Sequence, residues 1–544
     1  MPFLTRRSAF GAVFVATLAV VANAAVLANR FTLDDRFIIL QNARLRLGEF
    51  DQFFAQSWWP PGTGTGLYRP LTMTLLGLEW ALGGGRPAVF FAVGLVLHAL
   101  VTLGVLALAR QVLSPWPALA VAALFAVHPV HVEAIASGVG QAELLAALLV
   151  IVPLAAYIET RRAGPLDGRT GLLVVACGFA ALFAKENGIV LPALVVAAEI
   201  VLALSPVPAR RRWGALGALL AAWGAMAAIW FGTRASILHG FAGEVPLRLY
   251  EGRSMLARAR MAFGIIPEWS RLLVWPRDLL AEYMTDAVRV PQVLRSGELA
   301  GVLIVAAAVT LALVCRRRSP AVVFGIVALP LTLAPVANVL VPTGILLAER
   351  TLYLPSAFFL IAVAGIAETV LAVRGRKPWA PAFAAMTLLL VCAGTWRGYR
   401  RIRDWRDDDT VFRTLVRDAP DNAHARQLMG AWDFEHGRAA DGEREYRYAI
   451  ALTPWDGQLY EQLGWQYLNR GFCAPAEPLF REALRLGGPR QAATIGLVEC
   501  LLDRGEAAEA TVLVRRALAA GRDPRSLYAR LRRAESMQRR SGAR

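Results

Sequence analysis

The sequence predicts an all-α protein: a polytopic membrane helix bundle of about 11 spans, followed by a soluble α-solenoid of short repeats. Of the 544 residues, 56% are hydrophobic and only 18% are charged, whereas soluble proteins carry about 25% charged residues. The apolar residues gather in runs close to the ~20 residues that cross a bilayer. The region after Arg397 is more polar and repeats with a fixed period.

Eleven apolar runs are candidate membrane spans, and the basic clusters between them predict the orientation. The runs lie near 9–28, 87–109, 115–128, 142–159, 170–184, 188–204, 214–231, 298–315, 320–338, 351–373 and 378–396. Clusters such as Arg6-Arg7, Arg161-Arg162 and Arg316 to Arg318 separate alternate runs, as in cytoplasmic loops. We therefore expect a bacterial-type inner-membrane protein with a cytoplasmic N-terminus and a non-cytoplasmic repeat region. The first run could instead be a signal peptide, but an uncleaved helix suits the charge parity better.

The charge distribution argues against one class of partner, and the cysteine content argues against two kinds of structural feature. The net charge of +17 falls mostly in residues 1–396, within the loop clusters. No basic stripe alternates with aromatic residues as single-strand binding requires, so nucleic acid is not an expected partner. Five cysteines, three of them in apolar runs, exclude a disulfide framework or a cysteine-rich metal cluster.

The stretch 255–280 is hydrophobic but interrupted by charges, and we expect an interfacial amphipathic helix there.

After Arg397 the sequence repeats every 34 residues. The repeated positions are Gly437, Gly471 and Gly505, then Ala449, Ala483 and Ala517. This period is typical of tetratricopeptide helix pairs, in which small residues let the two helices pack closely. We expect a membrane domain over 1–396, a linker over 397–421 and a repeat domain over 422–540. Such an array binds a peptide or protein on its concave face; a stalk without a ligand is the alternative.

Four polar segments fall on the non-cytoplasmic side in this topology. They are 30–86, 128–143, 185–188 and 339–353. Charged residues at or within a membrane are costly and are functional candidates by default. We therefore expect the four segments to form one site.

The first of these segments offers an acidic pair and an arginine. Asp34 and Asp35 follow the first span by a few residues, where a carboxylate could act as general base toward an acceptor hydroxyl. Capping of the next helix is the alternative. Tyr68 and Arg69 precede a proline that starts a helix, and the planar guanidinium suits a phosphate. An interfacial anchor is the alternative for this arginine.

The second segment contains histidines and carboxylates. His128, His131 and Glu133 follow the third span, and Glu143 enters the fourth. We expect these side chains to line the same cavity as the acidic pair. A metal site would need further ligands on one helical face, and none is evident, so no metal is expected.

The remaining two segments add cations. Lys185 is one of only two lysines, and with Glu186 it occupies a turn between spans, where the ammonium suits phosphate or sugar contacts. An internal ion pair is the alternative. Glu349 and Arg350 place another charge pair before the tenth span. There is no Walker motif, and we expect no redox or nucleotide cofactor.

The order of these motifs resembles the transmembrane and tetratricopeptide-repeat O-mannosyltransferases, within the C-type superfamily of polyprenyl-phosphate-sugar-dependent glycosyltransferases. The matching residues are Asp34-Asp35 with Asn42, Tyr68 to Leu71, His98, His128 to Ala134, Gly140 to Leu145, Lys185 to Gly188, and Glu349-Arg350 with Tyr353 and Pro355. The resemblance covers nearly the whole chain. The chain departs from the family in its short repeat array, its few lysines, and Gln141, where members usually carry Arg.

The resemblance implies an eleven-span membrane enzyme that transfers mannose from a lipid phosphate to Ser or Thr hydroxyls. Its partners would be the lipid-linked sugar donor, membrane lipid, an exported acceptor protein and a protein bound by the repeats. Inversion at the anomeric carbon needs a base, and a cation for the departing phosphate. We expect Asp35, slightly ahead of Asp34, as the base and Arg69 at the phosphate, supported by Lys185 or Arg350. The alternatives are a transferase acting on a lipid or surface glycan and a non-catalytic membrane-anchored scaffold.

Overall fold

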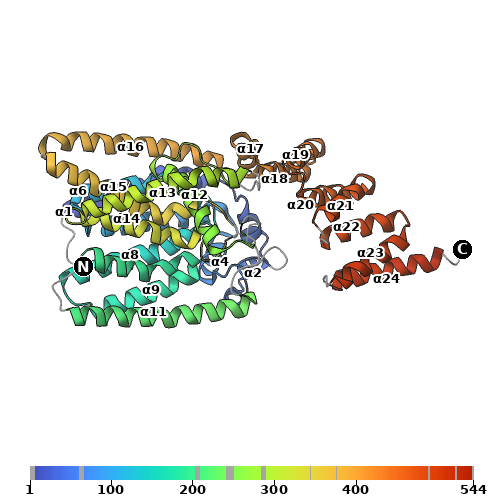
Figure 1. Cartoon of the computed structure of the whole chain (residues 1–544), viewed down its shortest axis with the longest axis horizontal. Helices are drawn as coiled ribbons and strands as arrows, with labels where there is room; N and C mark the ends of the chain where they lie inside the picture. Colours follow the sequence, from blue (N-terminus) through green and yellow to red (C-terminus); the bar gives the residue numbers. More distant parts are fainter. Residues whose placement is uncertain are drawn as a thin grey trace. The chain divides into compact units, whose positions relative to one another are not determined.

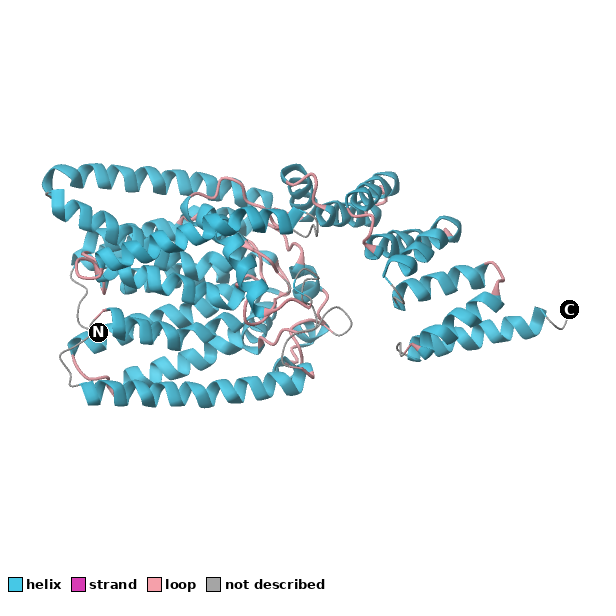
Figure 2. Cartoon of the chain, viewed as in Figure 1, coloured by secondary structure: helices cyan, strands magenta, loops and turns pink. Residues whose placement is uncertain are grey.

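The computed structural model describes residues 6–60, 66–202, 209–240, 250, 252–283, 289–343, 345–374, 376–487, 491–520 and 524–541. Every regular element in this part of the chain is a helix, which confirms the all-α prediction (Figure 2). The chain forms two compact units, residues 1–283 with 287–411 and residues 412–544 with 284–286. The boundary near 411 lies within one helix, α17 (Asp408–Asp418).

Each of the eleven apolar runs forms a helix in the first unit (Figure 1). These helices are α1 (Arg6–Asn23), α5 (Pro87–Arg110), α6 (Pro115–Ala126), α8 (Gln141–Ala163), α9 (Gly168–Ala184), α10 (Leu191–Val201), α11 (Ala209–Leu238), α13 (Arg289–Cys315), α14 (Pro320–Leu333), α15 (Tyr353–Arg374) and α16 (Arg376–Asp404). Among the described residues, seven helices are long and apolar enough to cross a membrane. A bent pair that begins with α6 would make an eighth. The other three, α9, α10 and α14, contain 17, 11 and 14 residues.

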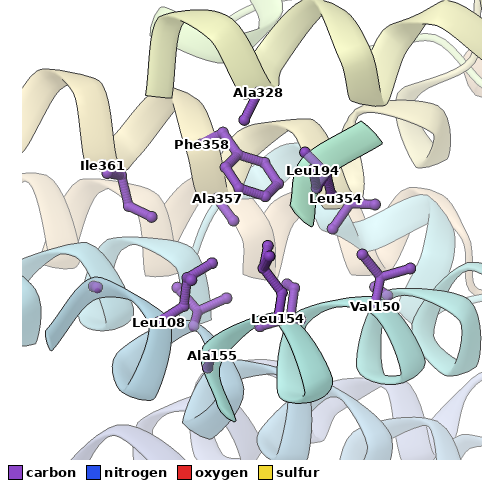
Figure 3. Packing of buried hydrophobic residues seen from close by; sticks show 14 of the residues in the cluster. Leu108, Val150, Leu154, Ala155, Leu194, Ala328, Leu354, Ala357, Phe358 and Ile361 are labelled. Atoms are coloured by element: carbon purple, nitrogen blue, oxygen red, sulfur yellow. The ribbon is translucent and has the colours of Figure 1, made fainter. Parts of the chain in front are cut away.

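The apolar faces of these helices meet in one core. Leu108 of α5, Leu154 of α8 and Phe358 of α15 pack together with Ala328 of α14 (Figure 3). Glycine allows the closest approach, because a Cβ at Gly325 of α14 would lie 2.6 Å from the carbonyl oxygen of Phe358. Lipid tails are as apolar as another helix, so close packing of this kind holds membrane helices together.

Short helices form the polar segments between these long ones. The first segment contains η2 (Arg36–Leu40), α2 (Ala43–Leu47), α3 (Phe50–Ala55) and α4 (Pro70–Gly83), and η1 (Ala24–Ala28) lies just before it. The others contain η3 (Pro129–His131) with α7 (Val132–Ile135), then η4 (Glu186–Val190) and η7 (Glu349–Leu352), and η6 (Ala334–Val336) lies just before the fourth segment. Figure 1 shows α2 and α4 at one end of the bundle. The hydroxyl of Thr72 in α4 donates to the carbonyl oxygen of Ala184 at 2.8 Å, which joins the first and third polar segments.

The hydrophobic stretch 255–280 contains α12 (Met255–Val274). Its inner face buries Trp269 and Leu272, and the helix packs against α13. A Cβ at Gly301 of α13 would meet the carbonyl oxygen of Phe263 at 2.0 Å, so this contact requires glycine.

The second unit consists of helix pairs. They are α18 (Ala423–Glu435) with α19 (Ala439–Leu452), α20 (Gly457–Leu468) with α21 (Cys473–Gly487), and α22 (Gln491–Asp503) with α23 (Ala507–Ala519), followed by α24 (Pro524–Ser541). Gly437, Gly471 and Gly505 join the helices of each pair at φ values of +77°, +81° and +81°, which suit glycine. The period of 34 residues therefore corresponds to one helix pair. The residues 397–421, expected as a linker, contain the end of α16 and the whole of α17.

Candidate functional site

Asp35 is a buried anchor for the first polar segment. It lies between η1 and η2 and is fully buried. Its carboxylate accepts hydrogen bonds from the Ser137 hydroxyl at 3.0 Å and from the N–H groups of Gly138 and Val139 at 2.9 Å. Burial raises the pKa of Asp35 to about 7, although the three donors act in the opposite direction. The carboxylate thus fastens the first segment to the turn before α8.

Asp34 has a different environment. Its side chain is half-buried, and no hydrogen bond or ion pair engages it within the described part of the chain. Its negative charge acts on the guanidinium of Arg350. A general base needs a carboxylate that a substrate hydroxyl can reach. Asp34 is therefore the more accessible of the two carboxylates, whereas the sequence slightly favoured Asp35 as the base.

Three cation–carboxylate pairs join the polar segments. Arg350 pairs with Glu133 through Nη1, and its backbone N–H donates to the same carboxylate at 2.8 Å. The Nζ of Lys185 pairs with Glu143. Each pair joins two different polar segments, so the pairs fix the segments relative to one another.

Arg69 and Glu186 form the third pair. Nε and Nη2 of Arg69 donate to Oε2 of Glu186 at 3.0 and 2.9 Å. The guanidinium also lies over the ring of Trp58, 5.4 Å from its centroid. The structure thus places Arg69, the residue expected at the phosphate, in direct contact with the third polar segment.

One electrostatic network connects the pairs. The pKa of Lys185 is lowered to about 8: burial and the nearby charges of Arg69 and Arg350 lower it, and the charge of Glu143 raises it. The charge of Glu143 also acts on Arg350. The four polar segments therefore meet around one group of charges.

Tyr68 and Glu349 are held by other contacts. The Tyr68 hydroxyl donates to the carbonyl oxygen of Phe54 at 2.9 Å, and its ring packs against Phe183. Glu349 is fully buried and accepts from Arg401 at 2.8 Å and from the Tyr283 hydroxyl at 3.0 Å. Both side chains support the loops that carry Arg69 and Arg350.

The histidines lie in a buried aromatic cluster. Ser356 donates its hydroxyl hydrogen to the Tyr353 carbonyl oxygen, so Nε2 of His131 donates to the Ser356 oxygen at 2.8 Å. His128 contacts the carbonyl oxygen of Leu273 at 3.1 Å through Nε2. His98 bridges the Tyr353 hydroxyl and a backbone carbonyl. Among the described residues, no three His, Cys, Asp or Glu side chains gather as metal ligands would.

Sequence reasoning missed two acidic residues close to the site. Glu79 of α4 is buried, and its Oε2 accepts from Gln141 at 3.1 Å. Asp408 accepts the backbone N–H of Leu33 at 2.8 Å. Glu79 could have been found from the sequence, because it is the single charge in an apolar run. Asp408 could not, because it lies in a short acidic run whose pattern is that of residues capping a helix.

No family model matches the chain. The chain is 25% identical over 476 residues to human "Protein O-mannosyl-transferase TMTC1", which covers 78% of this chain and 52% of that protein. It is 25% identical over 419 residues to Caenorhabditis elegans "Protein O-mannosyl-transferase F38B6.6" (74% and 57%) and 26% identical over 437 residues to mouse "Protein O-mannosyl-transferase TMTC4" (70% and 57%). The chain spans about half the length of these relatives. Over most of its own length it is thus similar to the transmembrane and tetratricopeptide-repeat O-mannosyltransferases, the family that its motifs predict.

Proposed function

We propose that this chain is an integral-membrane glycosyltransferase that moves mannose from a polyprenyl phosphate to Ser or Thr hydroxyls of exported proteins. The observation that carries the proposal is the half-buried carboxylate of Asp34 in the field of Arg350, whose charge also acts on Lys185 together with that of Arg69. The names of the similar proteins, all protein O-mannosyl-transferases, support the same reaction.

In this reaction Asp34 acts as the general base. Its carboxylate takes the proton from the acceptor hydroxyl, and the hydroxyl oxygen attacks the anomeric carbon of the sugar. The bond from that carbon to the lipid phosphate breaks, which releases polyprenyl phosphate and leaves the sugar inverted on the acceptor. General-base assistance is typically worth about 10² to 10⁴ in rate.

Arg350, Lys185 and Arg69 would stabilise the charge that develops on the departing phosphate. Each already contacts a carboxylate, which fixes its position before substrate binds and avoids reorganisation during the reaction. A guanidinium carries five N–H donors. The side chain of Arg350 contacts Glu133 through Nη1, so further donors remain to contact phosphate oxygens.

The repeat unit would bind the acceptor protein or a partner on the non-cytoplasmic side. Helix pairs of this type present an extended surface for peptides. The membrane supplies the lipid-linked donor to the first unit, and no metal or redox cofactor enters the proposed chemistry. A cysteine introduced at Asp456 of the full chain should therefore react with an impermeant reagent in intact cells.

A direct test uses the purified full chain in detergent with polyprenyl-phosphate mannose and Ser/Thr-containing peptides. We expect mannose on the peptide by mass spectrometry, and no transfer by Asp34→Asn. Transfer to an added lipid glycan instead of the peptide would favour the related glycan transferase. No donor consumption with any acceptor would favour a scaffold. Comparing glycopeptides of exported proteins with and without the gene would then identify the natural acceptors.

A further inference from the structure

The two neighbours of Asp34 in sequence are both held by distant parts of the chain. Asp35 is fastened to the 137–139 turn by three hydrogen bonds. On the other side, the N–H of Leu33 donates to Oδ1 of Asp408 at 2.8 Å. Leu33 has a φ of +51°, a conformation that non-glycine residues adopt rarely and keep only where surrounding contacts enforce it.

The buried side chain of Asp408 holds Leu33 in that conformation. Only 4% of its side chain is exposed, and its Oδ2 pairs with Nη1 of Arg36 at 3.5 Å. The Asp408 carboxylate therefore contacts residues on both sides of Asp34: Leu33, immediately before it, and Arg36, two residues after it.

The chain just before Asp408 holds the same segment further upstream. The side-chain amide of Asn29 donates to the carbonyl oxygens of Ile402 and Trp405, both at 3.0 Å. The backbone N–H of Arg30 donates to the carbonyl oxygen of Arg406 at 2.8 Å. Residues 29–36 are thus bound along the end of α16 and the start of α17.

We propose that Asp408 is a positioning residue for the reaction: by holding the Leu33 amide, it sets the direction in which the Asp34 carboxylate faces. This inference rests on the proposed function, because it takes Asp34 as the base. Asp35 fixes the position of the segment, and Asp408 fixes its rotation about the chain direction. A misplacement of about 1 Å at a reacting group can lower the rate roughly 10²-fold.

Asp407 provides a matched control. It precedes Asp408 in the same acidic run, but its Oδ1 accepts the N–H and hydroxyl of Thr410 at 2.9 and 2.6 Å, so it caps α17. Asp407→Ala removes one charge and one cap from this run without touching residues 29–36. Asp408→Asn keeps an acceptor for the Leu33 N–H while removing the charge.

The test measures turnover and hydrogen exchange on the full chain. We expect Asp408→Ala to lower kcat about 10- to 100-fold with the donor KM nearly unchanged, and to speed exchange in a peptide covering 29–36. Asp407→Ala should stay within about twofold of wild type in both measurements, and Asp408→Asn within about threefold in kcat. In an Asp34→Asn background, Asp408→Ala should cause no further loss, because it acts through Asp34.

The outcomes separate the two proposals. Wild-type kcat and exchange in Asp408→Ala would overturn the positioning role, as would an additive loss in the Asp34→Asn background. Full activity of Asp34→Asn would instead overturn the base assignment. If Asp408→Ala does not fold, Asp408→Asn decides: loss of turnover with the Leu33 amide still protected contradicts the proposal, and retention of both supports it.

Discussion

The ion pairs of the two units are made from the same residue types but differ in geometry. In the repeat unit, Asp441 and Arg444 pair one helical turn apart and are both exposed. In the first unit, Glu133 pairs with Arg350 across 217 residues of sequence, and its carboxylate is buried. An exposed pair contributes about 0–1 kcal/mol, whereas removing one member of a buried pair costs about 3–5 kcal/mol. The comparison teaches that the buried Glu133–Arg350 pair joins two polar segments of the site, whereas the exposed Asp441–Arg444 pair stays within one helix.

The largest effect is expected from Asp34→Asn, because no hydrogen bond or ion pair holds this carboxylate among the residues that the structure describes. Turnover should fall about 10² to 10⁴-fold while the melting temperature of the purified chain stays near wild type. Initial rates of mannose transfer and a thermal melt in the same detergent test this. A melting temperature that falls together with the rate would make Asp34 a structural residue like its paired neighbours.

Lys185→Ala should have the next largest effect, on stability. The change leaves the Glu143 carboxylate buried without its cation, which should lower the free energy of unfolding by about 3–5 kcal/mol. Adding Glu143→Gln should recover much of that loss, since no unpaired charge then remains. Thermal melts of the single and double variants test this. If the double variant melted at the same temperature as Lys185→Ala, Lys185 and Glu143 would not form a buried ion pair.

Asp35→Asn should act on stability and only indirectly on chemistry. An amide group cannot accept on both sides, so one of the donors from Ser137, Gly138 or Val139 would face an N–H. We expect a loss of about 1–3 kcal/mol. A chain that melts like wild type but does not transfer sugar would return the role of base to Asp35.

Glu79→Gln is expected to stabilise the chain. Burial raises the pKa of Glu79 to about 9, from about 4.5 in the unfolded chain. Between these pH values the folded chain holds a proton that the unfolded chain releases, so this group's contribution to stability falls as pH rises. The advantage of the variant should therefore grow steadily from pH 5 to pH 9.

Melting temperatures of wild type and Glu79→Gln across that pH range measure the advantage. Asp51→Asn, an exposed acid in the same segment, should show no such trend. An advantage that stays constant over this pH range would mean that Glu79 is ionised in the folded chain.

Arg444→Gln should have the smallest effect. The pair with Asp441 is exposed, and its loss should change the free energy of unfolding by at most about 0.5 kcal/mol. A melting transition of the repeat unit within about 1–2 °C of wild type is expected. A larger shift would show that this exposed pair also contributes to the stability of the repeat unit.

The sequence predicts the helices well because their signals are local. Apolar runs of sufficient length can be read directly, and so can glycines that recur every 34 residues, as at Gly437 and Gly471. The alternation of basic clusters also placed the polar segments on one side, and the structure brings Asp34, Arg350 and Lys185 together in one network.

The contacts within the site could not be predicted, because they depend on packing between distant segments. Nothing local distinguishes Asp34 from Asp35; the difference arises only when the 137–139 turn meets one carboxylate. Asp408 is 375 residues away from its Leu33 contact and lies in a run that suggested only helix capping. The internal ion pair was an open alternative for Lys185, and the structure gives it a specific partner, Glu143.

The unit boundary inside α17 determines where the repeat array could be exchanged for another one. Composition changes near Arg397, which makes that position look like a natural junction for a chimera. A graft there would replace Ile402, Trp405 and Asp408, and a foreign array would arrive without the atoms that hold residues 29–36. A graft after Asp418, where α17 ends, keeps them. The modular joint of this architecture is therefore about twenty residues beyond the point where the membrane-like sequence stops.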